Sequence, residues 1–280
     1  MRTGGRAAAA VSGFELAGET TPIPELVGDI WRSRSLLGML ARKDFVVRYR
    51  RAAFGLLWAV AMPLFQALVV AAVLSKIVRF ETGVDYPVFV YSGMVLWTAF
   101  STSLTFASTS IVDAADLSTK VYFPRAVLPL VSVLSNTYGL LVGVLIFLVM
   151  AVVTGVSLDI GVLLVIPAVL LTLALTAGFA LVFAALHVYF RDMRYLVQAA
   201  LIVWFYASPV FYPLRVTKSL RPLLEINPMT GAIELFRAGT IGADQAWGTS
   251  VVIAVVWAVG LLLVAAILHR RFNRVFVDLL

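Results

Sequence analysis

Six long apolar runs dominate this chain, and most of its basic residues lie before, after or between alternate runs. The runs cover residues 54–75, 86–109, 126–154, 160–186, 195–213 and 247–268, and none contains Asp, Glu, Lys or Arg. A helix needs about 20 residues to cross a hydrocarbon layer about 30 Å thick, and its backbone must satisfy its own hydrogen bonds there. The sequence therefore predicts an all-α integral membrane protein with six transmembrane helices.

The distribution of charge predicts the orientation of these helices. The chain is 61% hydrophobic with a net charge of +7, and its mean hydropathy is +0.98. The basic residues gather at 2–51, 120–125, 191–194 and 270–274, which places both termini in the cytoplasm by the positive-inside rule. Such a pattern predicts contact with membrane lipids and no nucleic-acid partner.

Four basic residues between 215 and 237 fit that rule poorly. Segment 214–245 is also too long and too apolar in part for a simple loop. We expect short helices after Pro222 and Pro228, in a segment that dips back into the membrane or lies at its outer surface.

The segment before the first apolar run divides in two. Residues 1–29 are small and polar and predict a mostly disordered cytoplasmic tail. Residues 30–52 place an apolar face on a helix that carries many charges, which predicts an amphipathic helix at the cytoplasmic membrane surface and leaves 53–280 as the transmembrane domain. Arg48, Arg50 and Arg51 either anchor the first membrane helix in anionic headgroups or contact a substrate.

Several kinds of chemistry are missing from the sequence. It has no Gly-x-x-x-x-Gly-Lys-[Ser/Thr] motif for ATP phosphates. It has no cysteine, and its two histidines, His187 and His269, lie far apart, so we expect no metal site and a structural role for His187. The apolar runs hold no carboxylate or base, which disfavours an ion-coupled carrier. It also disfavours an enzyme that acts within the membrane, because such an enzyme needs acid and base groups within reach of its substrate.

The run 86–109 has an aromatic arc beside a hydroxyl arc when drawn as a helix. The aromatic arc contains Tyr86, Phe89, Trp97 and Phe100, and the hydroxyl arc contains Thr98, Ser101 and Thr105. Rings stack on the apolar faces of sugars and hydroxyls exchange hydrogen bonds with them, so these residues predict a wall along which a glycan slides. The same residue types also pack membrane helices and form aromatic belts, and both interpretations stay open.

Two charged segments follow membrane runs on the predicted cytoplasmic side. Residues 111–120 predict a short helix with Asp113 near its start and Lys120 near its end, as the helix dipole favours. Residues 191–194 (RDMR) form a tight charged turn after the fourth run.

A series of sequence blocks then points to a known family. The blocks are 42–50 (RKDFVVRYR), 54–58 (FGLLW), 120–125 (KVYFPR), 190–194 (FRDMR), 208–213 (SPVFYP), 227–230 (NPMT) and 233–237 (IELFR). In this order the chain resembles the permease subunit of ABC type-2 exporters of lipid-linked polysaccharides and teichoic acids. Any one block alone would be weak, and together they are specific.

The resemblance implies a fold, partners and roles for particular residues. It implies a homodimer in the bacterial inner membrane, with six helices per subunit and re-entrant outer helices between the fifth and sixth. It also implies two separate ATPase subunits that bind ATP and Mg, and a polyprenyl-diphosphate-linked glycan as substrate. Contact with the ATPases would come from the amphipathic helix and from Asp113, Asp116, Leu117, Lys120, Arg191, Asp192 and Arg194. As a further hypothesis, Arg48, Arg50 or Arg51 binds the lipid diphosphate at the cytoplasmic gate.

Two other functions remain as alternatives. An ABC type-2 permease for small molecules such as drugs would share much of the pattern. A membrane enzyme that builds lipid-linked glycans would need clustered carboxylates at the membrane edge, and the one close pair there, Asp113 and Asp116, is explained equally well by helix capping. The identity of the glycan does not follow from the sequence. A cell-wall galactan or an O-antigen-like polymer is our prediction.

Overall fold

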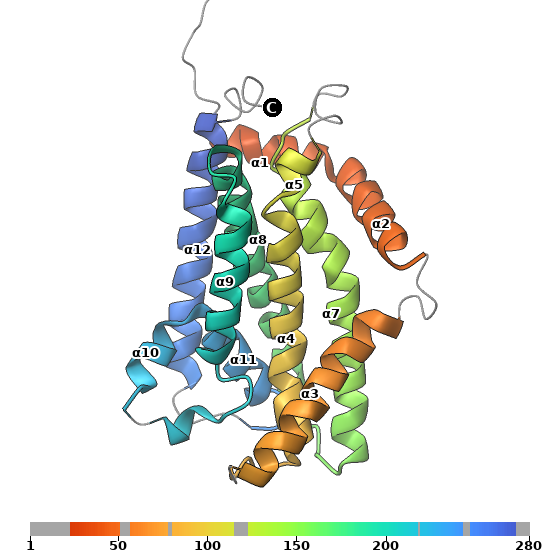
Figure 1. Cartoon of the computed structure of the whole chain (residues 1–280), viewed down its shortest axis with the longest axis vertical. Helices are drawn as coiled ribbons and strands as arrows, with labels where there is room; N and C mark the ends of the chain where they lie inside the picture. Colours follow the sequence, from red (N-terminus) through yellow and green to blue (C-terminus); the bar gives the residue numbers. More distant parts are fainter. Residues whose placement is uncertain are drawn as a thin grey trace, which may run out of the picture.

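The structure is a computed structural model and describes residues 23–50, 57–77, 80–114, 123–217, 219–242 and 247–272. Within these ranges the regular structure is entirely helical, as predicted (Figure 1). The helices are α1 (Ile23–Arg32), α2 (Arg34–Arg50), α3 (Leu57–Ile77), α4 (Tyr86–Ala107), α5 (Ser110–Asp113), α7 (Val127–Val153), α8 (Val165–Tyr189), α9 (Met193–Tyr206), α10 (Arg221–Ile226), α11 (Pro228–Ala238) and α12 (Trp247–Phe272), with 3-10 turns η1 (Ile160–Leu164) and η2 (Leu214–Val216).

Four segments are long and apolar enough to cross a membrane. They are Tyr86–Ala107, Val127–Val153, Ile160–Tyr189 and Trp247–Arg270, and they coincide with the second, third, fourth and sixth predicted runs. The first and fifth runs form the shorter apolar helices Ala61–Lys76, within α3, and Met193–Tyr206, which is α9. The chain is therefore a multi-pass membrane protein.

The long helices surround α4, which is the most enclosed of them (Figure 1). In its most apolar window 72% of the residues are buried, against 17% in α12. α4 packs against α3, α7 and α8, while α12 packs against α8 and α11. By contrast, α9 buries only Val197 and Leu201. α3 and α9 thus lie at the margin of the bundle, on either side of α4.

The bundle has two distinct ends. α1, α5 and the C-terminal end of α12 lie at one end, called here the α1 end, and α10 and α11 lie at the other, the α11 end (Figure 1). The short helices predicted after Pro222 and Pro228 are confirmed as α10 and α11. At the start of α11 the Asn227 side chain accepts a hydrogen bond from the Met229 N–H at 3.0 Å, which caps the helix.

α11 packs closely on α12 because Gly231 lacks a side chain. A Cβ at Gly231 would collide with the Ser250 carbonyl and with the Ala254 side chain of α12. Any larger residue there would force the two helices apart, so this glycine holds the short helix against the bundle.

The N-terminal helical region differs in extent from the predicted segment 30–52. It begins at Ile23 and has two parts, α1 and α2, with Ser33 between them. The Ser33 hydroxyl donates to the Asp29 carbonyl at 2.8 Å, a local bond of the kind that bends helices. Glu25 in the first turn of α1 favours the early start through the helix dipole.

Candidate functional site

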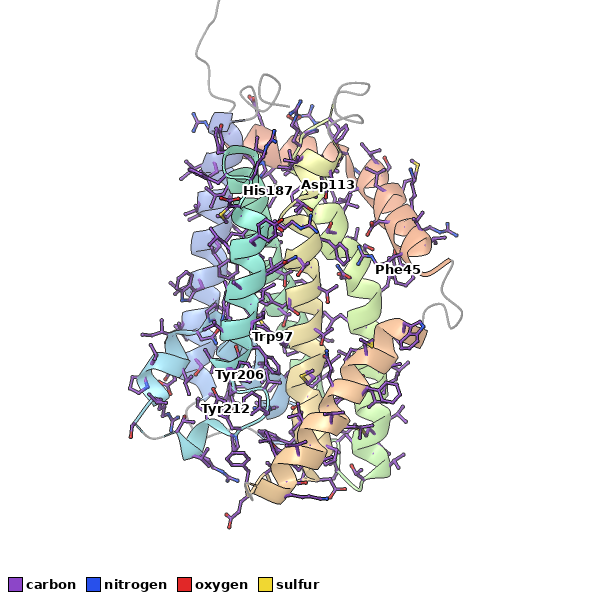
Figure 2. The ribbon with its side chains drawn as sticks, in the orientation of Figure 1. Phe45, Trp97, Asp113, His187, Tyr206 and Tyr212 are labelled. Atoms are coloured by element: carbon purple, nitrogen blue, oxygen red, sulfur yellow. The ribbon has the colours of Figure 1, made fainter. Side chains whose placement is uncertain are left out.

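A groove of about 750 Å³ lies between α3, α4 and α9. α4 forms its floor with Thr98, Ser101, Thr102 and Thr105, while α3 and α9 form its walls. The walls are largely apolar and well exposed, with Phe65 of α3 at 60% and Tyr206 of α9 at 64%. Figure 2 labels Trp97 of α4 and Tyr206 of α9, two aromatic residues of this lining. The groove is therefore an apolar trough with a hydroxyl-bearing floor.

The hydroxyls of the floor are arranged by α4 itself. The Ser101 hydroxyl donates to the Thr98 carbonyl at 3.3 Å, and the Thr105 hydroxyl donates to the Ser101 carbonyl at 2.8 Å. A hydroxyl that donates to its own helix keeps lone pairs that accept hydrogen bonds. The floor can therefore accept hydrogen bonds from a polar chain in the groove without a charge that would hold it tightly.

The structure divides the residues predicted to line a glycan channel into two groups. Trp97, Thr98, Ser101 and Thr105 line the groove. Tyr86, Phe89 and Phe100 do not.

Tyr86, Phe89 and Phe100 instead contact other segments of the bundle. Phe100 is fully buried and stacks edge-on against Trp204 at 5.1 Å between ring centroids. Phe89 lies under the Arg237 guanidinium at 3.8 Å, and the Tyr86 hydroxyl donates to the Phe211 carbonyl at 2.6 Å. The hydroxyl arc is open, while α8, α9 and the segment after α9 cover the rest of the aromatic arc beyond Trp97.

Sequence reasoning missed two amide side chains in the groove walls. Gln66 of α3 and Gln198 of α9 both line the groove. Each lies within an apolar run, where an amide that finds no partner is costly. An amide within an apolar run was therefore a sequence signal for a residue that faces a polar path.

Some of the charged residues predicted to contact an ATPase lie together at the α1 end. Asp113, Arg191 and Arg194 all lie within electrostatic reach of His187, and Figure 2 shows His187 and Asp113 close to the α1 end. Asp113 accepts a hydrogen bond from the Thr109 hydroxyl at 2.6 Å, and Asp192 precedes the first residue of α9. Of the predicted helix 111–120, residues 110–113 form α5, while Asp116, Leu117 and Lys120 lie outside the described residues.

A small apolar core joins these segments beneath the charges. Ile111 of α5 is fully buried with Phe123, Val127 and Leu128 of the next segment and Ala184 and Ala185 of α8. Leu36 and Leu37 of α2 pack against the same core. α2, α5 and the last turns of α8 therefore pack on one shared core.

Arg48 of the predicted phosphate-binding group already has partners within the protein. Its guanidinium donates to the Asn136 amide oxygen at 2.8 Å and to the Asp44 carboxylate at 2.7 Å. It also lies 3.9 Å from the centre of the Phe106 ring. The Arg50 side chain and all of Arg51 lie outside the described part of the chain.

The segment after α9 is fixed by a buried arginine that sequence reasoning did not single out. The Arg237 guanidinium donates to the Ser92 hydroxyl at 3.0 Å, the Val210 carbonyl at 2.9 Å and the Glu234 carboxylate at 3.1 Å. Burial lowers the pKa of Arg237, and the Glu234 carboxylate counteracts this effect. The pair Glu234 and Arg237, three residues apart in an otherwise apolar helix, was the available signal.

Asn227 makes a second fixed point at the same end. Its amide oxygen accepts from the Trp204 indole N–H at 2.7 Å. Its amide nitrogen donates to the Ala207 carbonyl and the Ser208 hydroxyl, each at 2.9 Å. Together with its cap of α11, these bonds connect α9, the segment after it and α11.

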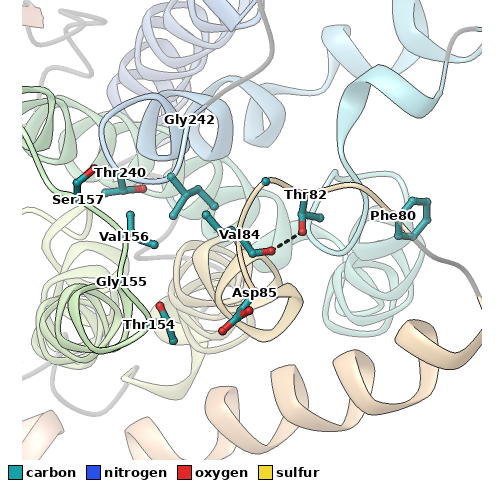
Figure 3. Close-up of a pocket in the computed structure, with 12 residues that line it drawn as sticks. Phe80, Thr82, Val84, Asp85, Thr154, Gly155, Val156, Ser157, Thr240 and Gly242 are labelled. Carbon is teal, nitrogen blue, oxygen red and sulfur yellow. Dashed lines mark hydrogen bonds between the residues drawn. The ribbon is translucent and has the colours of Figure 1, made fainter.

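A second hollow, of about 740 Å³, opens at the α11 end between the turns before α4, after α7 and after α11 (Figure 3). Its lining includes the hydroxyls of Thr82, Thr154, Ser157 and Thr240 and the carboxylate of Asp85. The Thr82 hydroxyl donates to the Val84 carbonyl at 2.7 Å. No group of three His, Cys, Asp or Glu side chains suited to a metal ion occurs among the described residues, in this hollow or elsewhere.

Comparison with known proteins places these features in a family. The sequence model of the ABC-2 type transporter family matches residues 35–241. The O-antigen export system permease protein RfbA of Myxococcus xanthus is 33% identical over 216 residues, which cover 76% of this chain and 83% of that relative. The O-antigen export system permease protein RfbA of Klebsiella pneumoniae is 27% identical over 215 residues, which cover 75% of this chain and 83% of that relative.

The match begins at the second residue of α2 and runs past the end of α11, so the resemblance first noted in short sequence blocks is confirmed over the helical bundle except α1 and α12. The match extends across most of the chain and includes the groove, the charged turns and the buried Arg237. This helical membrane protein belongs to the ABC-2 type transporter family.

Proposed function

We propose that this protein is the permease subunit of an ATP-driven exporter that moves a polyprenyl-diphosphate-linked polysaccharide out of the cytoplasm. The observation that carries the proposal is the groove, in which hydroxyls and amides line an otherwise apolar wall. Family membership and relatives that are named O-antigen export permeases support it. The exported glycan is then an O-antigen-like polymer or a cell-wall galactan.

The proposed topology has six crossings of the bacterial inner membrane. The four long apolar segments supply four crossings, and α3 and α9 supply the other two. α10 and α11 are then re-entrant helices on the outer side. The α1 end lies in the cytoplasm because α1, α2 and the turn at 191–194 carry many of the basic residues.

ATP hydrolysis in this proposal takes place in separate subunits, which bind ATP and Mg. The chain has no phosphate-binding loop of its own. Two ATPase subunits would contact the charged residues at the α1 end, namely Asp113, Asp116, Leu117, Lys120, Arg191, Asp192 and Arg194. The shared core around Ile111 supports this assignment because it connects α2, α5 and α8 mechanically.

The transport path in this proposal forms between two permeases whose grooves face each other. The exposed apolar walls of α3 and α9 would then be covered by the second copy and by the moving glycan. Arg48 has partners inside the protein, so we assign binding of the lipid diphosphate to Arg50 and Arg51, which precede α3 in the sequence. Arginine suits that role because its planar guanidinium binds phosphate through two hydrogen bonds.

Depletion of the protein in its own host tests the proposal. We expect full-length polyprenyl-linked polymer to accumulate in the cytoplasmic leaflet, and re-expression of the wild-type protein should reverse this. An inactive ATPase partner should produce the same accumulation. Normal glycan export with altered drug tolerance would instead indicate a small-molecule exporter, and loss of polymer synthesis would indicate an enzyme.

A further inference from the structure

Arg48 joins three helices at one point. Through its guanidinium, α2 is bonded to Asn136 of α7 and stacked on Phe106 of α4, with Asp44 of α2 balancing the charge. The Asn136 side chain is itself oriented, because its amide nitrogen donates to the Ser132 carbonyl at 2.8 Å. The guanidinium is therefore held on several sides by groups with defined positions.

Other contacts place the turns of α2 that precede Arg48 firmly on the bundle. The Phe45 and Tyr138 rings lie 4.9 Å apart between centroids, which adds a second link from α2 to α7. Ala41 is fully buried, and Leu36 and Leu37 rest on the core around Ile111. Figure 2 shows Phe45 on α2, on the side that faces α7.

The partners of Arg48 on α4 and α7 lie next to the groove. Phe106 follows Thr105, which lies on the floor of the groove. Asn136 borders a small hollow of about 50 Å³ together with Thr98 and Thr102 of the floor and Pro63 of α3. A displacement of α2 that is carried by Arg48 would therefore act directly on the residues beneath the moving chain.

We infer that Arg48 is a positioning residue that makes α2 move together with the adjoining parts of α4 and α7, so that motion of the cytoplasmic segments reaches the groove floor. The inference rests on the proposed ATP-driven export and names the link that transmits its force. Arginine suits this position because one planar guanidinium donates to Asp44 and Asn136 while its face stacks on Phe106. A lysine ammonium offers a point charge without that stacking.

The first test removes the link in the assembled transporter. Inverted membrane vesicles of the host would contain the permease with its ATPase, and the host's own lipid-linked glycan is the probe. In Arg48→Ala we expect glycan transported per ATP hydrolysed to fall about 10-fold, within the range of ordinary coupling energies, while assembly and ATP hydrolysis persist. Arg48→Lys should recover part of the loss, and Arg215→Ala, at an exposed arginine of the α11 end, should have no effect.

The second test replaces the link with a covalent one. Because the chain has no cysteine, Phe45→Cys and Tyr138→Cys supply the only thiols in the permease. A short bifunctional reagent would join the two thiols, and a reductant would release the cross-link. In the Arg48→Ala background, cross-linking α2 to α7 should restore transport per ATP toward the value of the uncross-linked double-cysteine protein. Asn136→Ala should lower this ratio as Arg48→Ala does, and the combined variant should be no worse than either alone.

Each outcome decides between explanations. Normal coupling in Arg48→Ala overturns the inference, and so does an uncoupled variant that the cross-link fails to restore, since a phosphate-binding Arg48 would behave in that way. A cross-link that stops transport when Arg48 is intact also overturns it, because α2 would then have to slide on α7. If the wild-type vesicles hydrolyse ATP and move no glycan, the proposed function itself fails.

Discussion

Arg48 and Arg237 both connect helices through a guanidinium, yet they differ in burial and in the groups that they reach in other segments. Arg237 has 1% of its side chain exposed and pairs with Glu234, which has 3% exposed. Arg48 has 19% exposed, and its acidic partner Asp44 has 38% exposed. The cross-helix partner of Arg48 is the neutral amide of Asn136, whereas Arg237 reaches a hydroxyl and a carbonyl in other segments.

This difference separates a fixed connection from an adjustable one. A buried ion pair cannot be broken cheaply, because the remaining charge has no water to solvate it. A partly exposed guanidinium can exchange a partner for water at a smaller cost. The α11 end is therefore expected to be the more costly of the two to disrupt, while the junction of α2 with α4 and α7 depends less on its ion pair.

The largest expected effect tests the fixed connection. Arg237→Ala leaves Glu234 buried without its partner, and we expect a loss of about 3–5 kcal/mol of stability, measured by denaturant titration of the solubilised protein. The double variant Arg237→Ala with Glu234→Ala should lose less, because no uncompensated charge remains. Arg215→Ala, an exposed arginine at the same end, is the matched control. Equal losses in Arg237→Ala and Arg215→Ala would remove the distinction between the two ends.

A neutral side chain at the same end separates the effect of charge from that of hydrogen bonding. Asn227→Ala removes the cap of α11 and the acceptor for the Trp204 indole, and we expect a loss of about 1–2 kcal/mol in the same titration. Asn227→Asp keeps the acceptor oxygen but lacks the amide donors to Ala207 and Ser208, so its loss should be intermediate. A loss as large as that of Arg237→Ala would show that hydrogen bonding, and not the buried charge, makes this end rigid.

Arg48 and Arg237 also mark the limit of what the sequence alone can predict. Apolar run length predicted the helices, and Pro222 and Pro228 predicted the two short ones, because these signals are local in the chain. The partners of Arg237 are 145 and 27 residues away in Ser92 and Val210, and Asn136 is 88 residues from Arg48. No local pattern contains these pairings, so the bond from Arg48 to Asn136 could not be predicted from the sequence.

The groove illustrates the same limit in another form. Helical periodicity separated most of the aromatic arc of α4 from its hydroxyl arc, although Trp97 of the aromatic arc lines the groove. It could not tell which arc the neighbouring helices cover, since that depends on packing of α8 and α9 with Trp204 against Phe100. Three of the seven predicted wall residues, Tyr86, Phe89 and Phe100, therefore pack against other segments, and the amides of Gln66 and Gln198 were left out.

In the proposed export, the neutral groups of the groove contact the moving glycan. Replacing Thr98 and Thr105 with valine and Ser101 with alanine should lower glycan transport about 3- to 10-fold, since each lost hydrogen bond contributes about 0.5–1.5 kcal/mol. Stability should change little. Thr137→Val in α7, whose hydroxyl donates to the Val133 carbonyl away from the groove, is the matched control. Transport by the triple variant at the wild-type rate would return these hydroxyls to a packing role.

The smallest expected effect concerns the acidic partner of Arg48. Asp44 precedes Arg48 by four residues on α2, the favourable order for such a pair, and Asp44→Asn should cost only about 0.3–0.5 kcal/mol of stability. The difference from the wild type should shrink further as salt is raised, because the carboxylate is exposed enough to be screened. Coupling should survive, since the bond to Asn136 and the stacking on Phe106 remain. A loss above about 1 kcal/mol that resists salt would mean that Arg48 depends on its ion pair as Arg237 does. In that event the junction at α2 would be a fixed connection of the same kind as the one at the α11 end.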